Sequence, residues 1–382
     1  MSAAPTGPAV TGRATETDVD VLVVGAGVAG LAAAHVLHGH GARMAVIEAA
    51  ATVGGRVRSA RDAHGRHLGD LGPSWVWPPY QPHAAAWLER LGIDTVEQFG
   101  RGDAVVERAP GRTERLALPG QHGQRRPVGG PQALVDALAA GLPDGSVATG
   151  TALLAVDAPA GNGGATVRTS AGTIAADRVV LALPLRVLAR DVASSTTLDP
   201  GLLALLRRAP TWMAGQAKAV VVYRTPFWRA AGLSGRIASA VGPLVEVHDH
   251  CGPDGSPAAL TGFVGLSAAA RRELAAREGP EALVRRAVGQ LARCLGPEAA
   301  DPIHASVEDW AADPRIATDE DASEPGVHPA VLPAAVRASL ADGRIHLAAA
   351  ETAAGAPGLL DGALEAGTRA AHAALGGRAP GR

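Results

Sequence analysis

The sequence has almost no lysine. Lys218 is the only lysine in 382 residues, although lysine and arginine together number 35. Arginine stays protonated in any protein setting, whereas a buried lysine can lose its proton and become a neutral donor, acceptor or base. Lys218 begins an apolar, β-branched run, Ala219 to Tyr223, that predicts a buried strand. This lysine is therefore either a chance survivor at a strand end or a residue whose chemistry arginine cannot replace.

Cysteine and long apolar segments are scarce too. Cys251 and Cys294 are the only cysteines and lack a metal-ligand spacing, which argues against a disulfide framework and favours a cytoplasmic protein with unpaired thiols. No stretch approaches the roughly 18 apolar residues that a membrane helix needs. Residues 1–17 lack an apolar core and predict a disordered tail rather than a signal peptide.

The chain also lacks an excess of charge of one sign. Its formal net charge is −2 and its arginines are scattered, so the sequence indicates neither nucleic-acid binding nor binding to an anionic membrane. Small molecules are the expected partners, and the oligomeric state is not indicated. A length of 382 residues with 47% apolar residues predicts two domains.

A glycine-rich motif lies near the start of the chain. Residues 18–50, "DVDVLVVGAGVAGLAAAHVLHGHGARMAVIEAA", predict a strand, a turn, a helix and a second strand. Gly25, Gly27 and Gly30 have the spacing that permits a tight turn, close approach of a pyrophosphate and packing of the helix on the strand. Glu48 ends the second strand, where an acidic side chain binds ribose hydroxyls and disfavours a 2′-phosphate, hence NADP. The alternative is a Rossmann-like turn without a ligand.

Two motifs after Glu48 resemble a known family. "GGR" occupies residues 54–56 and "GDLGPSWVWP" occupies residues 69–78. This order resembles the flavin-containing amine oxidase family, which includes monoamine, polyamine and L-amino-acid oxidases and in which FAD fills the site. Ala50 replaces the arginine that is usual there, and Pro73 replaces the usual second glycine.

The last predicted helix completes the resemblance. Residues 343–375, "GRIHLAAAETAAGAPGLLDGALEAGTRAAHAAL", predict a strand, a turn with Glu351 and a long helix. The resemblance implies that Glu351 contacts the ribityl or pyrophosphate part and that the Leu360 amide holds the flavin O2. An ordinary Ala-rich surface helix is the alternative. The full set of expected cofactor contacts is Gly25, Gly27, Gly30, Glu48, Gly54, Gly55, Arg56, Gly72, Ser74, Trp75, Leu153, Trp310, Glu351, Gly358 and Leu360.

These segments predict an α/β chain with two domains. A discontinuous FAD-binding Rossmann-like domain is expected from 18–75, 129–190 and 335–376, and a mixed-sheet α+β substrate domain from 76–128 and 195–330.

The stretch around Lys218 has its own counterpart in the family. "GQAKAVVVYRTPFW" resembles the strand whose lysine reaches the flavin N5 through a water molecule. The resemblance implies a catalytic role for Lys218: its ammonium stabilises nascent superoxide, and its water accepts a proton.

Glu246 and His248 fall on the strand that lines the substrate pocket in monoamine oxidases. We expect Glu246 to pair with a cationic group of the substrate and His248 to be its hydrogen-bond partner, and a solvated strand end is the alternative. The letters "HDHC" also suggest zinc ligands, but adjacent strand residues point to opposite faces, so no metal is expected.

The family pattern fails in part. Monoamine oxidases hold the amine between two tyrosines, but Leu359 follows Gly358 and the segment after Trp310 contains no aromatic residue. Leu359 is expected to contact the substrate in place of a tyrosine. That segment also lacks the cysteine used for covalent attachment, so FAD is expected to be non-covalent. Trp75, Trp77 and Trp310 are either flat walls of the site or ordinary core residues.

The sequence thus predicts an FAD-dependent amine oxidase that oxidises a C–N bond of a small amine or amino-acid derivative to an imine, with O2 reduced to H2O2. Two alternatives stay open: a desaturase of the same superfamily acting on a C–C bond, and a non-catalytic binding or escort protein with the same fold. The substrate itself, and whether O2 or another acceptor is used, are not indicated.

Overall fold

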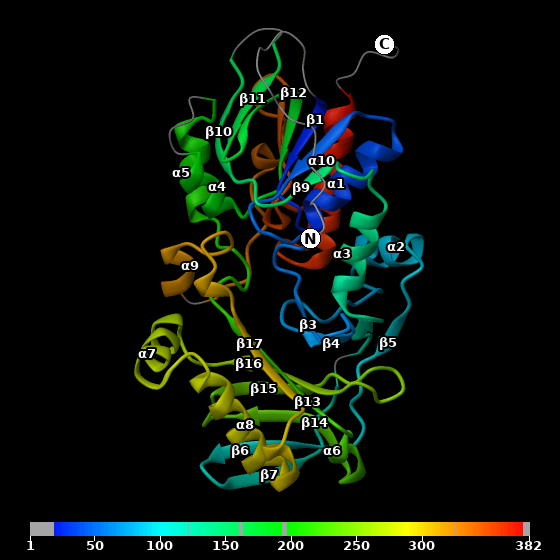
Figure 1. Ribbon diagram of the computed structural model, residues 1–382, viewed down its shortest axis with the longest axis vertical. Coiled ribbons are helices and arrows are strands. Elements are labelled where there is room, and N and C mark those ends of the chain that lie inside the picture. Colours follow the sequence, from blue (N-terminus) through cyan, green and yellow to red (C-terminus); the bar gives the residue numbers. More distant parts are fainter. Residues whose placement is uncertain (1–18, 121, 160–162, 193–196, 325, 377–382) are drawn as a thin grey trace, which may run out of the picture. The chain divides into compact units, whose positions relative to one another are not determined.

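The computed structural model describes residues 19–120, 122–159, 163–192, 197–324 and 326–376, so the predicted tail at 1–17 lies outside the described residues. The chain divides into two compact units (Figure 1). The first unit comprises Met1–Gly55, Val135–Trp212 and Val327–Arg382. The second unit comprises Arg56–Leu134 and Met213–Gly326.

The first unit is built on a sheet with the order β10-β11-β12-β1-β2-β9. β1 pairs in parallel with β12 on one side and with β2 on the other. The first half of β12 pairs antiparallel with β11, and its second half pairs in parallel with β18. The strands are β1 (Val19–Val24), β2 (Met44–Ile47), β9 (Val147–Ala148), β10 (Leu153–Asp157), β11 (Ala165–Thr169), β12 (Gly172–Leu181) and β18 (Ile345–Leu347).

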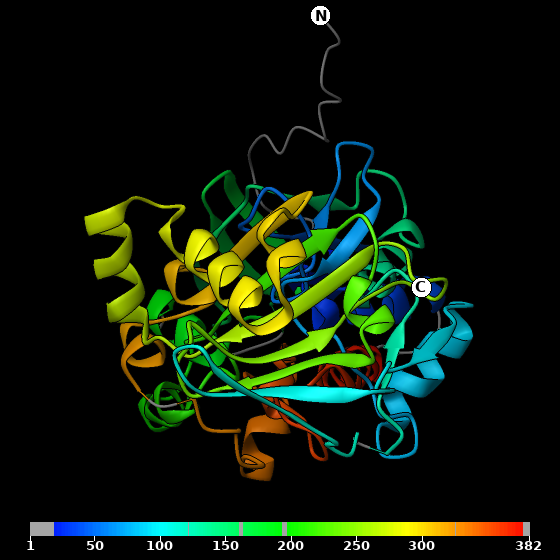
Figure 2. The same ribbon diagram turned by 90° about the horizontal axis from the view of Figure 1, so that it is seen from below.

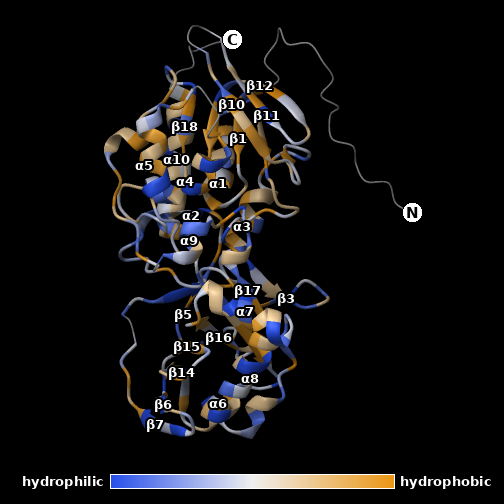
Figure 3. Cartoon of the chain, turned by 90° about the vertical axis from the view of Figure 1, so that its left-hand side faces the viewer, coloured by the Kyte–Doolittle hydropathy of each residue, from blue (hydrophilic) through white to orange (hydrophobic). Residues whose placement is uncertain are grey.

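Apolar residues fill the interior of the first unit. β1 after Val19 and the last three residues of β12, Val179–Leu181, are buried, as expected for parallel strands covered on both faces. β1 is largely orange in Figure 3. The first and last helices pack together because Gly367 on α10 lies directly against Ala29 on α1. The helices are α1 (Val28–Gly39), α3 (Pro131–Ala140, which includes the boundary at residue 134), α4 (Leu185–Asp191), α5 (Pro200–Arg208), η3 (Ala334–Arg337), η4 (Ala350–Thr352) and α10 (Leu360–Gly376).

The second unit is built on a sheet with the order β17-β13-β16-β15-β14-β6-β7, antiparallel except where β14 pairs with β6. Two further strand pairs, β3 with β4 and β5 with β8, accompany it. The strands are β3 (Ser59–Arg61), β4 (His67–Asp70), β5 (Thr95–Glu97), β6 (Asp103–Ala109), β7 (Arg112–Leu116), β8 (Arg125–Pro127), β13 (Ala217–Tyr223), β14 (Leu233–Ser239), β15 (Leu244–Asp249), β16 (Ala258–Val264) and β17 (His304–Asp309).

The two faces of this larger sheet are covered differently. α8 lies along one face (Figure 2), where Leu283, Ala287 and Leu291 pack against the apolar side chains of β13, β15 and β16. On the opposite face, Leu71 beside β4 packs against Val220 and other apolar residues. The helices of this unit are α2 (Pro82–Arg90), α6 (Phe227–Ala230), α7 (Ala268–Glu278), α8 (Ala282–Leu295), η1 (Pro297–Ala300), η2 (Trp310–Ala312) and α9 (Asp319–Ser323).

The predicted fold class is confirmed, since a Rossmann-like α/β unit accompanies a mixed-sheet unit. The residue ranges of the units differ from the expected domain ranges. Residues 56–75, expected with the FAD-binding domain, lie in the second unit because β4 pairs with β3 and packs on β13 and β16. Residues 197–212 and 327–330, expected with the substrate domain, lie in the first unit, and residues 129–134, expected with the FAD-binding domain, lie in the second. The functions assigned to the two domains stay predictions.

Candidate functional site

The turn between β1 and α1 has no room for a side chain at Gly25 or Gly30. A Cβ atom on Gly30 would lie 1.8 Å from the carbonyl oxygen of Gly25, and Gly25 itself has a φ of 98°. α1 begins after Gly27, no side-chain cap is formed there, and its first turn holds no acidic residue. The first backbone N–H groups of α1 therefore present an anion-binding end, which is what a pyrophosphate requires.

Glu48, directly after β2, is tied to this turn. Its Oε2 accepts a hydrogen bond from the Ala26 amide at 2.8 Å, and its Oε1 accepts one from the Ala50 amide at 2.8 Å. Gly54 forms a parallel bridge with Gly27, so the "GGR" motif begins beside the glycine turn. Both Gly54 and Gly55 have positive φ values. The carboxylate and the glycines thus form one connected structure within the first unit.

The C-terminal motif lies in the same unit. Glu351 is fully buried in η4, and its Oε1 accepts a hydrogen bond from the Trp212 amide at 3.2 Å. Gly358 has a φ of 79°, Leu359 is half-buried, and Leu360 begins α10, whose first-turn amides lie at a second helix N-terminus. Leu153 begins β10 and is buried.

Lys218 lies in the interior of the second unit. It is 3% exposed on β13, and its Nζ donates to the Gly72 carbonyl at 2.7 Å and to the Ser74 hydroxyl at 2.5 Å. The ammonium also lies 5.3 Å from the ring centres of Trp75 and Phe263, a distance suited to cation–π attraction. Burial lowers the pKa of Lys218 to about 8. The predicted buried strand is confirmed, and its lysine is held by the motif at 69–78.

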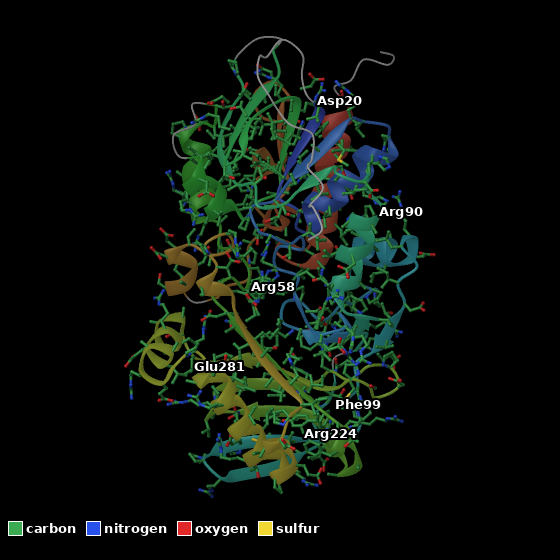
Figure 4. All side chains as sticks on the ribbon, viewed as in Figure 1. Asp20, Arg58, Arg90, Phe99, Arg224 and Glu281 are labelled. Carbon is green, nitrogen blue, oxygen red and sulfur yellow. The ribbon has the colours of Figure 1, made fainter. Side chains whose placement is uncertain are left out.

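The register of the sheet places further polar residues on the same face as Lys218. Phe263 on β16 and Glu308 on β17 lie directly opposite Lys218, and Glu246 on β15 lies opposite Phe263. Directly opposite residues share one face of a sheet. The Arg58 guanidinium forms an ion pair with Glu308, and Arg58 is labelled in Figure 4.

Glu246 and His248 form a local pair. His248 Nε2 lies 2.9 Å from Glu246 Oε1, and Arg236 Nη2 lies 3.8 Å from the same oxygen. The hydrogen bond from His248 lowers the pKa of Glu246 despite its partial burial. The His248 ring packs edge-on against Trp75, with 4.9 Å between ring centres. Glu246 and His248 therefore lie on the same sheet as Lys218, with the carboxylate already partly matched by positive charge. Leu359, the third predicted substrate residue, lies in the first unit.

The tryptophans differ in their surroundings. Trp310 is buried, donates to the Leu71 carbonyl at 3.0 Å and has Arg58 over its ring, so it packs as a core residue. Trp75 is half-buried and donates to Gln98 at 2.7 Å. Trp77 is half-buried, and Arg56 is half-buried at the start of the second unit.

Sequence reasoning missed a cluster beside Lys218. His67 and His250 both contact the carboxylate of Asp70, at 2.8 Å and 2.9 Å. The two histidines of "HDHC" are thus used separately, since His248 contacts Glu246 and His250 contacts Asp70. A detectable signal was the spacing His67-x-x-Asp70 at the start of the motif at 69–78. The second histidine could not be found this way, because it is 180 residues from Asp70.

Two other features bear on the expectations about cysteine and membranes. Cys251 and Cys294 are both free and buried. Within the described ranges, no helix combines the length and apolarity that crossing a bilayer demands.

Known proteins resemble this chain in sequence and fold. Residues 112–375 match the family described as flavin containing amine oxidoreductase, and residues 23–91 match a NAD(P)-binding Rossmann-like domain. A probable flavin-containing monoamine oxidase A of Dictyostelium discoideum is 31% identical over 53% of this chain and 43% of its own length. Amine oxidase B of Cavia porcellus is 31% identical over 45% of this chain and 32% of its own length. The matches thus span less than half of these two relatives.

Solved structures share the fold. A putrescine oxidase bound to putrescine superposes with a TM-score of 0.75 at 23% identity, covering 94% of this chain and 99% of that one. Cyclohexylamine oxidase from Brevibacterium oxydans gives a TM-score of 0.76 at 19% identity, with the same coverage.

Proposed function

Because the chain belongs to the family of flavin containing amine oxidoreductases, we propose that it is an FAD-dependent amine oxidase acting on a small amine or amino-acid derivative. The observation that carries this proposal is the buried Lys218, the only lysine of the chain, held by the Gly72 carbonyl and the Ser74 hydroxyl. Burying an ammonium group is unfavourable unless it is matched by hydrogen bonds and charge, so its retention favours a chemical role. The two free, buried cysteines also support a cytoplasmic location.

The residues of the first unit fit a dinucleotide. The glycine turn and the uncapped N-terminus of α1 suit the pyrophosphate, and Glu48 suits the adenosine ribose. We assign the remaining FAD contacts to Arg56, Glu351 and the amide of Leu360, with non-covalent binding. When bound, FAD supplies a hydride acceptor at N5 for the carbon next to the amine nitrogen, giving an imine, and O2 reoxidises it to yield H2O2.

Lys218 serves the oxygen step in this proposal. Its pKa of about 8 leaves it largely protonated at pH 7, and its neighbours are rings and neutral oxygen acceptors. An ammonium in such a poorly solvated place stabilises the negative charge that develops on O2, because electrostatic interactions are stronger where water is excluded.

Glu246 is proposed to attract the cationic group of the substrate. Its carboxylate, held by His248, lies on the same face of the sheet as Lys218. His248 keeps Glu246 ionised, since its hydrogen bond lowers the carboxyl pKa. The half-buried ring of Trp75 beside His248 is suited to the apolar part of an amine.

The test is the visible spectrum of the purified protein without oxygen. We expect a flavin spectrum that bleaches on adding one of three pools, primary amines, secondary amines or amino acids, and H2O2 release once air is admitted. A yellow protein that no pool bleaches would favour a desaturase. A colourless protein that cannot be reconstituted with FAD would favour the escort protein instead.

A further inference from the structure

Asp70 is a buried carboxylate that the proposed chemistry does not use. It ends β4, shortly before Gly72 and Ser74, the two acceptors of Lys218 Nζ. Its side chain is 1% exposed, and its backbone carbonyl accepts a hydrogen bond from Thr261 on β16 at 3.3 Å. Anchoring Asp70 therefore helps to fix the position of the Gly72 carbonyl and the Ser74 hydroxyl, which accept hydrogen bonds from Lys218.

Two imidazoles hold the Asp70 carboxylate. His67 Nε2 lies 2.8 Å from Oδ1, His250 Nε2 lies 2.9 Å from Oδ2, and Ser59 Oγ donates to Oδ1 at 3.1 Å. An ionised carboxylate can only accept hydrogen bonds, so both histidines donate from Nε2. Burial works to raise the pKa of Asp70, but the interactions with His250 and His67 outweigh it and keep the pKa below its usual value.

His250 stabilises Asp70 without cancelling its charge. Burial, with the charge of Arg126 adding to it, lowers the pKa of His250 to about 4, so His250 is neutral at pH 7. A neutral donor stabilises a carboxylate without adding a positive charge, whereas an arginine partner would cancel its field. His250 therefore leaves the negative charge of Asp70 in place inside the second unit.

Three other carboxylates of the second unit are paired with side chains other than Lys218. Asp249 receives two hydrogen bonds from Arg229, both at 2.8 Å. Glu308 is paired with Arg58, and Glu246 is paired with His248. These partners cancel or reduce the fields of the remaining carboxylates.

One further cation lies in this region. Arg126 is buried and donates to the Cys251 carbonyl at 2.6 Å, and its Nε has no hydrogen-bond partner within the described part of the chain. Asp70 attracts both Lys218 and Arg126, and Asp249 attracts Arg126 as well.

We propose that Asp70 is the positioning residue for Lys218: its charge keeps the buried ammonium protonated, and its anchoring by His67 and His250 fixes the segment that holds the lysine. This inference deepens the proposed function, on which the catalytic use of Lys218 rests. In support, the charge of Asp70 acts against the lowering of the Lys218 pKa by burial, while the charge of Arg126 adds to that lowering.

A metal ion is the competing interpretation of the same cluster. One ligand atom each of His67, Asp70 and His250 lies within 4.8 Å of the others. A cation among them would replace both imidazole hydrogen bonds and add positive charge near Lys218 and Arg126, which is electrostatically unfavourable. The structure therefore assigns hydrogen bonds to this cluster, and metal analysis of the purified protein checks the assignment.

The single lysine makes a direct test possible. The full-length protein is made with lysine that carries ¹³C at Cε, and its affinity tag contains no lysine. Its NMR spectrum then has one lysine signal, and the chemical shift of that signal against pH reports the titration of Lys218. We expect the midpoint to fall by about 1 pH unit or more in Asp70→Asn, because a nearby opposite charge shifts a pKa by roughly 1–3 units. Asp70→Glu, which keeps the charge in a longer side chain, should return most of the way to the wild-type midpoint.

The controls separate charge from folding. Glu107→Gln removes another buried carboxylate of the second unit, one bonded to Ser239, and should leave the Lys218 midpoint unchanged. If Asp70→Asn does not accumulate as folded protein, the titration is measured on Asp70→Ser instead. The smaller serine side chain leaves room for a water molecule. An unchanged midpoint in a folded, uncharged variant overturns the proposal. So does one equivalent of bound metal in the wild type that is lost in Asp70→Asn.

A second measurement links the titration to the flavin. In FAD-loaded protein, the rate of flavin reoxidation should fall as pH rises through the Lys218 pKa, and in Asp70→Asn it should fall at a lower pH. If the protein binds no flavin or oxidises no amine, the proposed function fails, but the lysine titration still decides the role of Asp70. If the Lys218 midpoint changes in Asp70→Asn but the reoxidation rate does not depend on pH, Asp70 keeps its electrostatic effect on Lys218. Lys218 then has no role in the oxygen step.

Discussion

The two units differ in the groups that stabilise charge, which are mainly backbone N–H groups in the first unit and side chains in the second. In the first unit, backbone N–H groups at a glycine turn and at helix N-termini face the place expected for a ligand, and Glu48 is held by two backbone amides. In the second unit, side chains from distant parts of the chain meet, as Lys218 and Ser74 do, and as His250 and Asp70 do. Backbone recognition depends on the absence of side chains, and side-chain recognition depends on tertiary packing. The first unit should therefore be sensitive to added volume and the second to changed charge.

Adding one methyl group at the glycine turn tests the first half of this comparison. Gly30→Ala would place Cβ 1.8 Å from the Gly25 carbonyl oxygen, so we expect FAD affinity to fall about 100-fold or more, at a cost of about 3 kcal/mol. Gly39→Ala, at the end of the same helix with open space around it, should keep its flavin. Flavin content and titration with FAD measure both. Equal binding by the two variants would contradict the close approach described here.

Removing the buried charge tests the second half. Lys218→Met keeps the length and apolar stem of the side chain, so we expect normal FAD binding and normal reduction by the amine. Reoxidation by O2 should be slower by about 100-fold, the effect typical of removing one charge-stabilising donor. Stopped-flow mixing of the reduced protein with oxygenated buffer measures the rate. Unchanged reoxidation would remove Lys218 from the oxygen step.

Acidification should lower the free energy of unfolding of each unit, because each contains a buried histidine that is neutral in the folded protein. Burial lowers the pKa of His250 in the second unit and of His346 in the first to about 4. Between pH 6.5 and 4 the unfolded chain binds protons that the folded protein does not, so stability is full above 6.5 and is lost as pH falls. Each histidine should account for a loss on the order of 2–3 kcal/mol.

Urea unfolding at pH 7 and pH 4.5 measures this loss. His250→Gln and His346→Gln should each reduce the difference between the two pH values, and a probe placed in each unit shows which unit responds. A difference that persists undiminished in both variants would mean that other groups cause the acid sensitivity.

The smallest effect is expected at Glu246, whose carboxylate is partly exposed and already paired. Glu246→Gln should raise the apparent KM for the true substrate about 2- to 5-fold and leave kcat nearly unchanged, as expected for a solvent-screened ion pair. Glu114→Gln, which removes an exposed partner of Arg108, is the matched control. A KM that does not change would remove Glu246 from substrate binding.

The parts that could be predicted from sequence are those specified by local pattern. Gly25, Gly30 and Glu48 lie within one short βαβ segment, and Lys218 heads a continuous apolar run, so neighbouring residues were sufficient to place them. His250 could not be placed on Asp70, because their contact depends on how β4 packs against β13 and β16. The same holds for residues 56–75, whose unit is decided by that packing rather than by their motif.

The pairing of β12 with both β1 and β18 has a consequence for biosynthesis. During synthesis β1 precedes β18 and α10. β18 pairs with β12, and α10 packs on α1. The surfaces of β12 and α1 that these two elements cover therefore stay exposed until the nascent chain has passed residue 376. The second unit needs nothing beyond residue 326 and can close earlier. The unit whose first strand is made before the second unit is thus completed after it, and its apolar strands stay exposed for longer during synthesis.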